Sequence, residues 1–231
     1  MQGRCNLEFR SLLPVISLAV VLSASVTILA RDLHPARPKL FYVFKPLTTA
    51  LIFAAALLPG NFPTDSYAAA ICLGLAFSLC GDVWLMLPGD RFLHGLVSFL
   101  FAHLCYGFAF RTGAAANGFP WVLLLLSMIG AITLGYLWPT LSAALRGAVG
   151  LYVAVLVLMT ALAEGCALAH FSIGTLSAAM GALLFLASDM VLAIDRFRRP
   201  FYLARAVVLG SYFAGQLMIA LSVGLLAYPS A

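Results

Sequence analysis

The stretch YAAAICLGLAFSLCGDVWLML, residues 67–87, decides the fold class of this chain. A run of roughly 20 predominantly apolar residues crosses the hydrocarbon core of a bilayer as one helix. Asp82 lies near the end of this run. Inserting a carboxylate into a membrane span costs about 2.5–3.5 kcal/mol of free energy, and helix packing does not require one. The stretch therefore predicts a transmembrane helix and marks Asp82 as a candidate functional residue.

The composition extends this interpretation to the whole chain. Of 231 residues, 64% are hydrophobic and 9% are charged, which is too few polar residues to cover a water-soluble domain. We expect an all-α polytopic membrane bundle of about eight helices, a single integral membrane domain over residues 1–231. The expected spans, separated by Pro, Gly or charge, are Leu12–Ala30, Leu40–Leu58, Tyr67–Leu87, Phe92–Phe110, Phe119–Trp138, Ala148–Ala169, Thr175–Ile194 and Phe201–Ala227.

The first of these spans has a second interpretation. Arg4 and Arg10 precede the apolar stretch Leu12–Ala30, and small residues end it, a pattern that signal peptides share. An uncleaved first span explains the same pattern, and we favour it.

The distribution of basic residues predicts the orientation of the chain. About ten Lys and Arg residues lie in or beside the first, third, fifth and seventh loops, and only Arg4, Arg10 and Arg111 lie on the opposite side. Cytoplasmic loops carry an excess of Lys and Arg. We therefore expect both termini outside the cytoplasm, with the protein in the inner membrane of a bacterium. The net charge of +5 reflects this orientation and indicates no nucleic-acid partner.

A short pattern occurs twice in the chain. Gly81-Asp82-Val83-Trp84-Leu85 precedes Asp90-Arg91-Phe92, and Ser188-Asp189-Met190-Val191-Leu192 precedes Asp195-Arg196-Phe197. An offset of four helices preserves orientation in the membrane, so the pattern is consistent with two parallel four-helix halves, residues 1–111 and 112–231. Coincidence also explains so short a match, and both interpretations stay open.

Asp189 occupies the position in the second pattern that Asp82 occupies in the first. Asp82 and Asp189 each lie six residues before a span boundary, which places both carboxyl groups roughly 9 Å below the same membrane face. We expect polar residues from several spans to meet them in one pocket. The candidates are Lys45, His103, Tyr152 and Tyr212.

The chain resembles the YhhN-like lysoplasmalogenase family in a series of short motifs. The resemblance rests on Gly81-Asp82-x-x-Leu85 through Phe92, Gly95, Phe99, Ala102-His103 and Tyr106, and on Lys45-Pro46, Tyr152 with Met159, Phe185-x-x-Ser188-Asp189 and Tyr212-Phe213-x-x-Gln216. It implies an integral membrane hydrolase of about eight helices. Such an enzyme cleaves the vinyl ether bond of lysoplasmalogens to a fatty aldehyde and glycerophosphoethanolamine or glycerophosphocholine. The implied partners are a lysophospholipid substrate and membrane lipids, without a cofactor and without any indication of oligomeric state.

Two carboxyl groups suit this chemistry. Enol ether cleavage begins with protonation of a vinyl carbon, and water then attacks the resulting oxocarbenium ion. One aspartate can stay protonated as the acid while the other stays ionised, as in glycosidases. The sequence does not assign these roles between Asp82 and Asp189. Lys45 would hold one carboxylate ionised or meet the substrate phosphate.

The remaining candidates each have a structural alternative. His103 can serve as an interhelical hydrogen-bonding group, Tyr106 is more typical of packing, and Tyr152, Tyr212 and Gln216 suit packing or positioning equally well. Ser188 is a candidate nucleophile, but small residues are common where membrane helices touch.

Two other function classes remain open. A proton-coupled transporter would use the Asp pair as a relay. A metal hydrolase would use Asp82, His103 and Asp189 as ligands, although the chain lacks close His or Cys spacing for a metal. A lipid-organising protein is the least favoured class, because it leaves two buried carboxylates unexplained.

Overall fold

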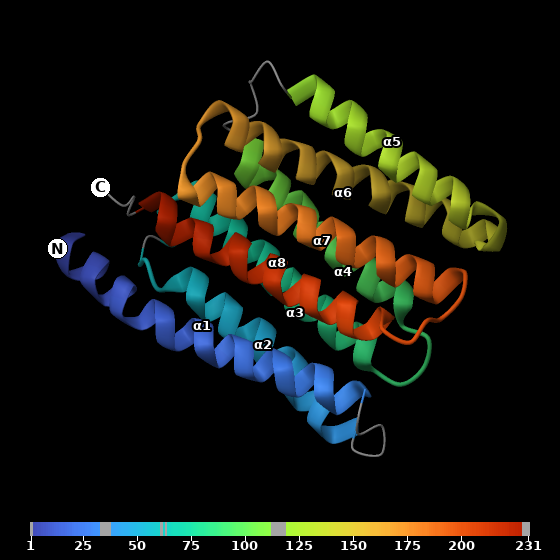
Figure 1. Ribbon diagram of the computed structural model, residues 1–231, viewed down its shortest axis with the longest axis horizontal. Helices are drawn as coiled ribbons and strands as arrows, with labels where there is room; N and C mark the ends of the chain where they lie inside the picture. The colour runs from blue at the N-terminus through green and yellow to red at the C-terminus, as the bar shows by residue number, and fades with distance from the viewer. Residues whose placement is uncertain (1, 33–37, 61, 63, 112–118, 228–231) are drawn as a thin grey trace.

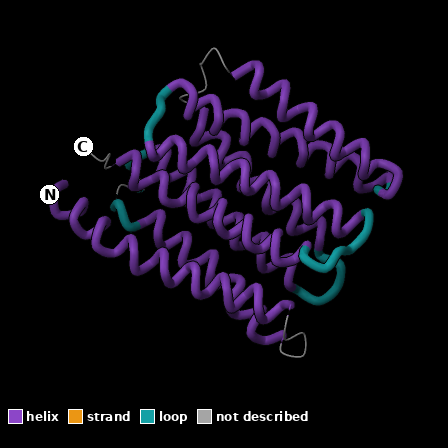
Figure 2. Tube along the Cα trace, in the orientation of Figure 1, coloured by secondary structure: helices purple, strands orange, loops and turns teal. Residues whose placement is uncertain are grey.

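The computed structural model describes residues 2–32, 38–60, 62, 64–111 and 119–227. These residues form eight α-helices and the short 3-10 helix η2, without any strand (Figures 1 and 2). All eight α-helices are long and apolar enough to cross a bilayer, which confirms the prediction of a polytopic all-α membrane bundle. Their bounds are α1 Gln2–Asp32, α2 Pro38–Leu57, α3 Ser66–Met86, α4 Phe92–Phe110, α5 Phe119–Leu137, η2 Trp138–Thr140, α6 Ala143–Ala169, α7 Ile173–Phe197 and α8 Ala204–Ala227.

Capping residues account for the starts of two helices. The Asp65 side chain accepts the Tyr67 amide at the start of α3, and Ser172 and Thr175 form a capping box at the start of α7. Such caps satisfy amides that lack a partner inside the helix. Helix α6 begins five residues before the expected boundary at Ala148, because hydropathy finds the apolar span and not the turn that precedes it.

The helices pack as consecutive hairpins. The most extensive contacts join α7 with α8 and α3 with α4, while α1 and α2 lie at one edge of the bundle and α5 and α6 at the other (Figure 1). Helix α1 begins, and α8 ends, at the same end of the bundle. The connections α3–α4, α5–α6 and α7–α8 lie at the opposite end, called the arginine-rich end below because Arg91, Arg146, Arg196, Arg198, Arg199 and Arg205 lie on or beside these connections.

Glycines permit the close approach of the central helices. A Cβ at Gly181 of α7 would lie 2.7 Å from the carbonyl oxygen of Gly215 in α8. A Cβ at Gly74 of α3 would lie 2.3 Å from the ring of Tyr106 in α4. Small residues at membrane helix interfaces allow such approach. The glycine at position 74 therefore leaves the space into which the Tyr106 ring enters the core.

The described residues bring the two repeated motifs to one end of the molecule. Asp90, beside the first motif, forms an ion pair of 2.7 Å with Arg196, beside the second. Asp82 lies four residues before the end of α3, whereas Asp189 lies eight residues before the end of α7. At about 1.5 Å per residue these positions are roughly 6 Å and 12 Å from their helix ends. The equal depth of the two carboxyl groups in the membrane stays a prediction. The division into two repeat halves stays a prediction.

Candidate functional site

Asp82 lies in a closed cluster of hydrogen-bond donors, called the Asp82 cluster below. The ammonium group of Lys45 lies 3.0 Å from Oδ1. The hydroxyl groups of Thr49 and Tyr212 donate to Oδ2 over 2.5 Å and 2.7 Å. The carboxylate side chain is only 1% exposed. Because Lys45 and Thr49 are one turn apart on α2 and Tyr212 is on α8, this carboxylate ties three helices together through charge-assisted hydrogen bonds.

Asp189 has different surroundings, called the Asp189 cluster below. The Tyr152 hydroxyl of α6 donates to Asp189 Oδ2. His103 of α4 lies with Nε2 2.9 Å from the Tyr152 hydroxyl and 3.6 Å from Asp189 Oδ2. The Asp189 side chain is 14% exposed. Since Tyr152 donates its hydroxyl proton to the carboxylate, His103 can donate to Tyr152, which makes a chain of three groups that can carry a proton.

A third polar group in the core explains Tyr106 and Gln216. The Tyr106 hydroxyl donates to Gln216 Oε1 over 2.7 Å and lies 3.3 Å from the Ser78 hydroxyl. Both Tyr106 and Gln216 are fully buried. Gln216 Nε2 and His103 Nδ1 are buried without a hydrogen-bond partner among the described residues. Tyr106 and Gln216 thus pair with each other and with neither aspartate.

Aromatic side chains lie between the two aspartate clusters. The Phe185 ring packs edge-on against both His103 and Tyr212, with centroids at 4.6 Å and 5.4 Å. Phe99 packs edge-on against Tyr212 and Phe185. In the described part of the chain no hydrogen bond joins the Asp82 cluster to the Asp189 cluster. Both aspartates have polar partners, as expected, but among the described residues these partners form two separate clusters and not one.

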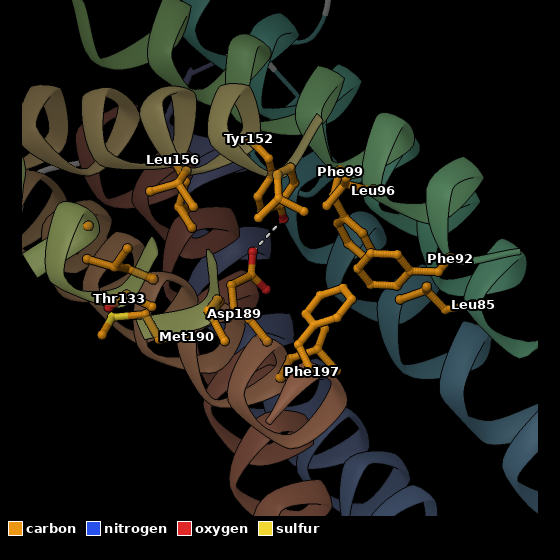
Figure 3. A pocket seen from close by; sticks show the side chains of 17 residues that line it. Leu85, Phe92, Leu96, Phe99, Thr133, Tyr152, Leu156, Asp189, Met190 and Phe197 are labelled. Carbon is orange, nitrogen blue, oxygen red and sulfur yellow. Dashed lines mark hydrogen bonds between the residues drawn. The ribbon is translucent and has the colours of Figure 1, made fainter. Parts of the chain in front are cut away.

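A cavity at the arginine-rich end exposes only one of the two carboxyl groups. It has a volume of about 70 Å³, more than the roughly 10–15 Å³ that one water molecule needs. Asp189 and Tyr152 face it (Figure 3), and Asp82 is not among its lining residues. Apart from Asp189, Tyr152 and Thr133, its lining is apolar, with Leu85, Phe92, Leu96, Phe99, Gly130, Leu137, Val149, Val153, Leu156, Leu186, Met190, Leu192, Ala193 and Phe197.

The Asp189 carboxyl group is oriented for chemistry in this cavity. Figure 3 shows one carboxyl oxygen held by Tyr152 and the other turned toward the side where Phe197 lies. A carboxyl group with one fixed and one free oxygen can deliver a proton to a bound molecule and take one back. The site therefore supports acid–base chemistry on a largely apolar ligand.

Two of the residues expected at the site have other partners. The Ser188 hydroxyl donates to the Val208 carbonyl over 3.0 Å, and Ser188 is absent from the cavity lining. Lys45 is occupied by Asp82, so it is not available to a substrate phosphate. Ser188 and Lys45 thus hold helices together.

The sequence reasoning missed Thr49 and the contribution of α5 to the cavity. Thr49 follows Lys45 by one helical turn, and this spacing would have placed both on one helix face. Gly130 and Thr133 of α5 line the cavity, but α5 carries no charged residue that would have drawn attention to it.

The described residues contain no group of three His, Cys, Asp or Glu side chains that could hold a metal ion. The ligand set considered from the sequence is divided, because Asp82 lies in one cluster and His103 and Asp189 lie in the other. The residues present therefore do not fit a metal-binding site.

Comparisons with known proteins identify relatives of this chain. The model of the YhhN family matches residues 40–223. The lysoplasmalogenase TMEM86A of Bos taurus is 35% identical over 77% of this chain and 74% of its own length. The uncharacterized membrane protein YhhN of Escherichia coli O157:H7 is 30% identical over 87% of this chain and 95% of its own length. The lysoplasmalogenase TMEM86B of Sus scrofa is 35% identical over 77% of this chain and 72% of its own length.

No solved structure matches the chain significantly. The family match covers seven of the eight helices, from α2 to α8, and it includes both aspartate clusters and the entire lining of the cavity. This confirms the resemblance found in the motifs, and the chain belongs to the YhhN family.

Proposed function

We propose that this integral membrane protein is a lysoplasmalogenase. It hydrolyses the vinyl ether bond of lysoplasmalogens to a fatty aldehyde and glycerophosphoethanolamine or glycerophosphocholine. The observation that carries the proposal is the Asp189 carboxyl group, which opens onto an otherwise apolar cavity and is bonded to Tyr152. The names of the relatives at 35% identity supply the class of reaction.

Asp189 is the proposed general acid. The free carboxyl oxygen of Asp189 gives its proton to the vinyl carbon that is not bonded to oxygen. A C–H bond forms there, the double bond is lost, and the carbon beside the ether oxygen becomes an oxocarbenium ion. The newly formed carboxylate stabilises this cation, because it carries the opposite charge in a dry cavity. The rings of Phe92 and Phe197 line the same cavity and add cation–π stabilisation.

The same carboxyl group serves as the base in the next step. Water adds to the oxocarbenium carbon and gives one proton to the Asp189 carboxylate, which leaves a hemiacetal. The hemiacetal collapses when the bond between this carbon and the ether oxygen breaks. The ether oxygen takes up the hydroxyl proton of the hemiacetal and leaves as the glycerol alcohol. One water is consumed and Asp189 ends protonated, ready for another turnover.

The other polar residues act through Asp189. The Tyr152 hydroxyl fixes one carboxyl oxygen, and His103 orients Tyr152 from the side that faces the core. Asp82 is proposed as a positioning residue. Its partner Tyr212 packs against Phe99, and Phe99 lines the cavity. A mechanism with both aspartates in contact with substrate is less well supported, because Asp82 lies outside the cavity.

The transporter alternative has the same difficulty. A relay through the Asp pair needs a continuous path of groups that exchange protons, and the rings of Phe99 and Phe185 separate the two clusters.

The basic residues at the arginine-rich end support a cytoplasmic position for that end, with both termini outside. A reporter fused after Ala231 should therefore be inactive if it requires the cytoplasm.

The experiment that tests the proposed function uses three lysophospholipids that differ only at the chain linkage. Detergent-purified protein should release aldehyde from the vinyl ether. The alkyl ether should remain intact, because it has no double bond to protonate. Comparable turnover of the ester would instead identify a lysophospholipase, and no turnover of the vinyl ether would refute the proposal.

A further inference from the structure

Two arginines flank the cavity at its outer end. Leu137 of α5 and Val149 of α6 line the cavity there, together with Phe197 at the end of α7. Arg146 precedes Val149 by three residues on the same helix, and Arg198 directly follows Phe197. Both arginines therefore lie within one helical turn of residues that line the cavity.

Arg146 has hydrogen-bonding capacity that the protein does not use. Its guanidinium group packs over the Trp138 ring at 5.1 Å. Its Nε is buried without a hydrogen-bond partner among the described residues. Buried polar groups nearly always have a partner, and a guanidinium group without an anion is costly to desolvate. In the described part of the chain, the half-buried side chain of Arg146 therefore has no anionic partner.

Arg198 is held in a defined orientation close by. Its guanidinium group lies 4.3 Å from the centre of the Tyr136 ring, and its Nε donates to the Tyr136 carbonyl over 2.7 Å. Tyr136 and Trp138 are the two neighbours of Leu137, which lines the cavity. Arg198 thus contacts the residue before Leu137, and Arg146 contacts the residue after it.

The acidic residues of this end are already occupied. Asp90 forms an ion pair with Arg196, and Asp195 accepts the backbone amide of Phe201 over 3.2 Å. Among the described residues, neither Arg146 nor Arg198 has an acidic partner. The arginine-rich end therefore carries an excess of positive charge beside the cavity, where a planar guanidinium group is well suited to a phosphate.

We propose that Arg146 and Arg198 bind the phosphate group of the lysophospholipid while its vinyl ether lies at Asp189. This inference rests on the proposed function. Tyr152, which contacts Asp189, lies six residues beyond Arg146 on α6, a rise of roughly 9 Å. That separation is of the same order as an extended glycerophosphate. The alkenyl chain then runs from Asp189 past Leu156 and Met190 into the apolar part of the cavity.

Two vinyl ether substrates test this assignment, a lysoplasmalogen and a 1-alkenylglycerol that lacks the phosphate. Arg146→Met and Arg198→Met should each raise KM for the lysoplasmalogen roughly 10-fold or more, because each removes charge-assisted hydrogen bonds. Both variants should turn over the alkenylglycerol at the wild-type rate, which also shows that they are folded. Arg199→Met is the matched control, since Arg199 is an exposed arginine at the same end, and it should change neither substrate.

The outcomes separate a general charge effect from a phosphate site. Equal losses on both substrates would overturn the assignment, and so would unchanged KM values for the lysoplasmalogen. If Arg199→Met raised KM as much as the other two substitutions, the effect would come from general attraction by positive charge, and the specific phosphate site would be refuted.

A binding measurement keeps this inference distinct from the proposed reaction. In a Trp84→Phe/Trp121→Phe background, which leaves Trp138 as the single tryptophan, fluorescence from beside Arg146 should report titration with a 1-alkyl lysophosphoethanolamine, which cannot be hydrolysed at a vinyl ether. The two variants should bind it more weakly than wild type and bind a 1-alkylglycerol equally well. If the variants bind in this way but the wild type does not cleave the vinyl ether, the proposed reaction is refuted and the headgroup site stands. Normal turnover with unchanged binding in both variants would remove the headgroup site alone. Competition by inorganic phosphate at the concentration of the lipid would overturn the assignment to a lipid headgroup.

Discussion

Asp82 and Asp189 both lie in the half of their helix nearer the arginine-rich end, but they have different surroundings. Asp82 accepts from Thr49 and Tyr212 and pairs with Lys45, and it is excluded from the cavity. Asp189 accepts from Tyr152 through one oxygen and faces the cavity with the other. Both are carboxylates inside membrane spans, yet only one has an oxygen available to a ligand.

The difference shows how an apolar bundle can use the same costly residue in two ways. The Asp82 cluster satisfies its carboxylate with donors from other helices, so the cost of burial is offset by links between α2, α3 and α8. The Asp189 cluster leaves part of its carboxyl group without a protein partner at the edge of a cavity. Unsatisfied polar groups of this kind are costly in a fold and are typical of functional sites.

The largest effect on turnover is expected from Asp189→Asn. Asparagine keeps the size of the side chain and its hydrogen bond to Tyr152, but it has no proton to donate and cannot act as the base. The rate of aldehyde release should fall by ~10²-fold or more, while the melting temperature in detergent stays close to wild type. Near-normal turnover in a folded Asp189→Asn protein would remove this residue from the mechanism.

Asp82→Asn should instead act on stability. It leaves the Lys45 ammonium buried without its counter-ion, and breaking a buried pair in this way costs about 3–5 kcal/mol. Thermal unfolding in detergent should show a large decrease for Asp82→Asn. The double variant Lys45→Met/Asp82→Asn should recover much of this loss, because it removes both charges together.

Turnover in the double variant decides the role of Asp82. We expect a rate within about tenfold of wild type, since the group that transfers the proton is intact. A folded double variant that has lost ~10²-fold or more in rate would place Asp82 in the reaction, as a mechanism with two catalytic carboxyl groups requires.

The smallest effect is expected from Ser188→Ala, next to Asp189 in the chain. The substitution removes one hydrogen bond to the Val208 carbonyl, which contributes about 1 kcal/mol. A small decrease in melting temperature without a change in the rate of aldehyde release is the expected result. A loss of turnover comparable to that of Asp189→Asn would reinstate Ser188 as a nucleophile.

Most of the fold could be predicted from the sequence because hydropathy alone fixes membrane spans. Every expected span lies largely within an observed helix. The ends were less accurate: α7 continues to Phe197 rather than Ile194, since an apolar span ends at the first charge and the helix does not. Asp195 and Arg196 continue the helix beyond the apolar segment.

Several polar residues of the two clusters could be named from the sequence, but their grouping could not. The position of a residue along a membrane helix indicates its depth in the bilayer. Lys45 and Asp82 were expected at the same membrane face, and they are in contact. Which side of α3 faces which neighbour depends on helix rotation and packing, and the sequence carries no direct signal of either. Tyr212 and His103 were expected to share one pocket, and the ring of Phe185 lies between them.

The central claim is that an acid in the cavity protonates the vinyl carbon and that cleavage then occurs on the vinyl side of the ether oxygen. Mass spectrometry of both products, formed in D₂O enriched with ¹⁸O and with the aldehyde trapped as it forms, tests this claim most directly. The account predicts one deuterium on the carbon next to the aldehyde carbonyl and no ¹⁸O in the glycerophosphate product, in wild type and in Lys45→Met/Asp82→Asn alike. Incorporation of ¹⁸O into the glycerol hydroxyl would contradict it.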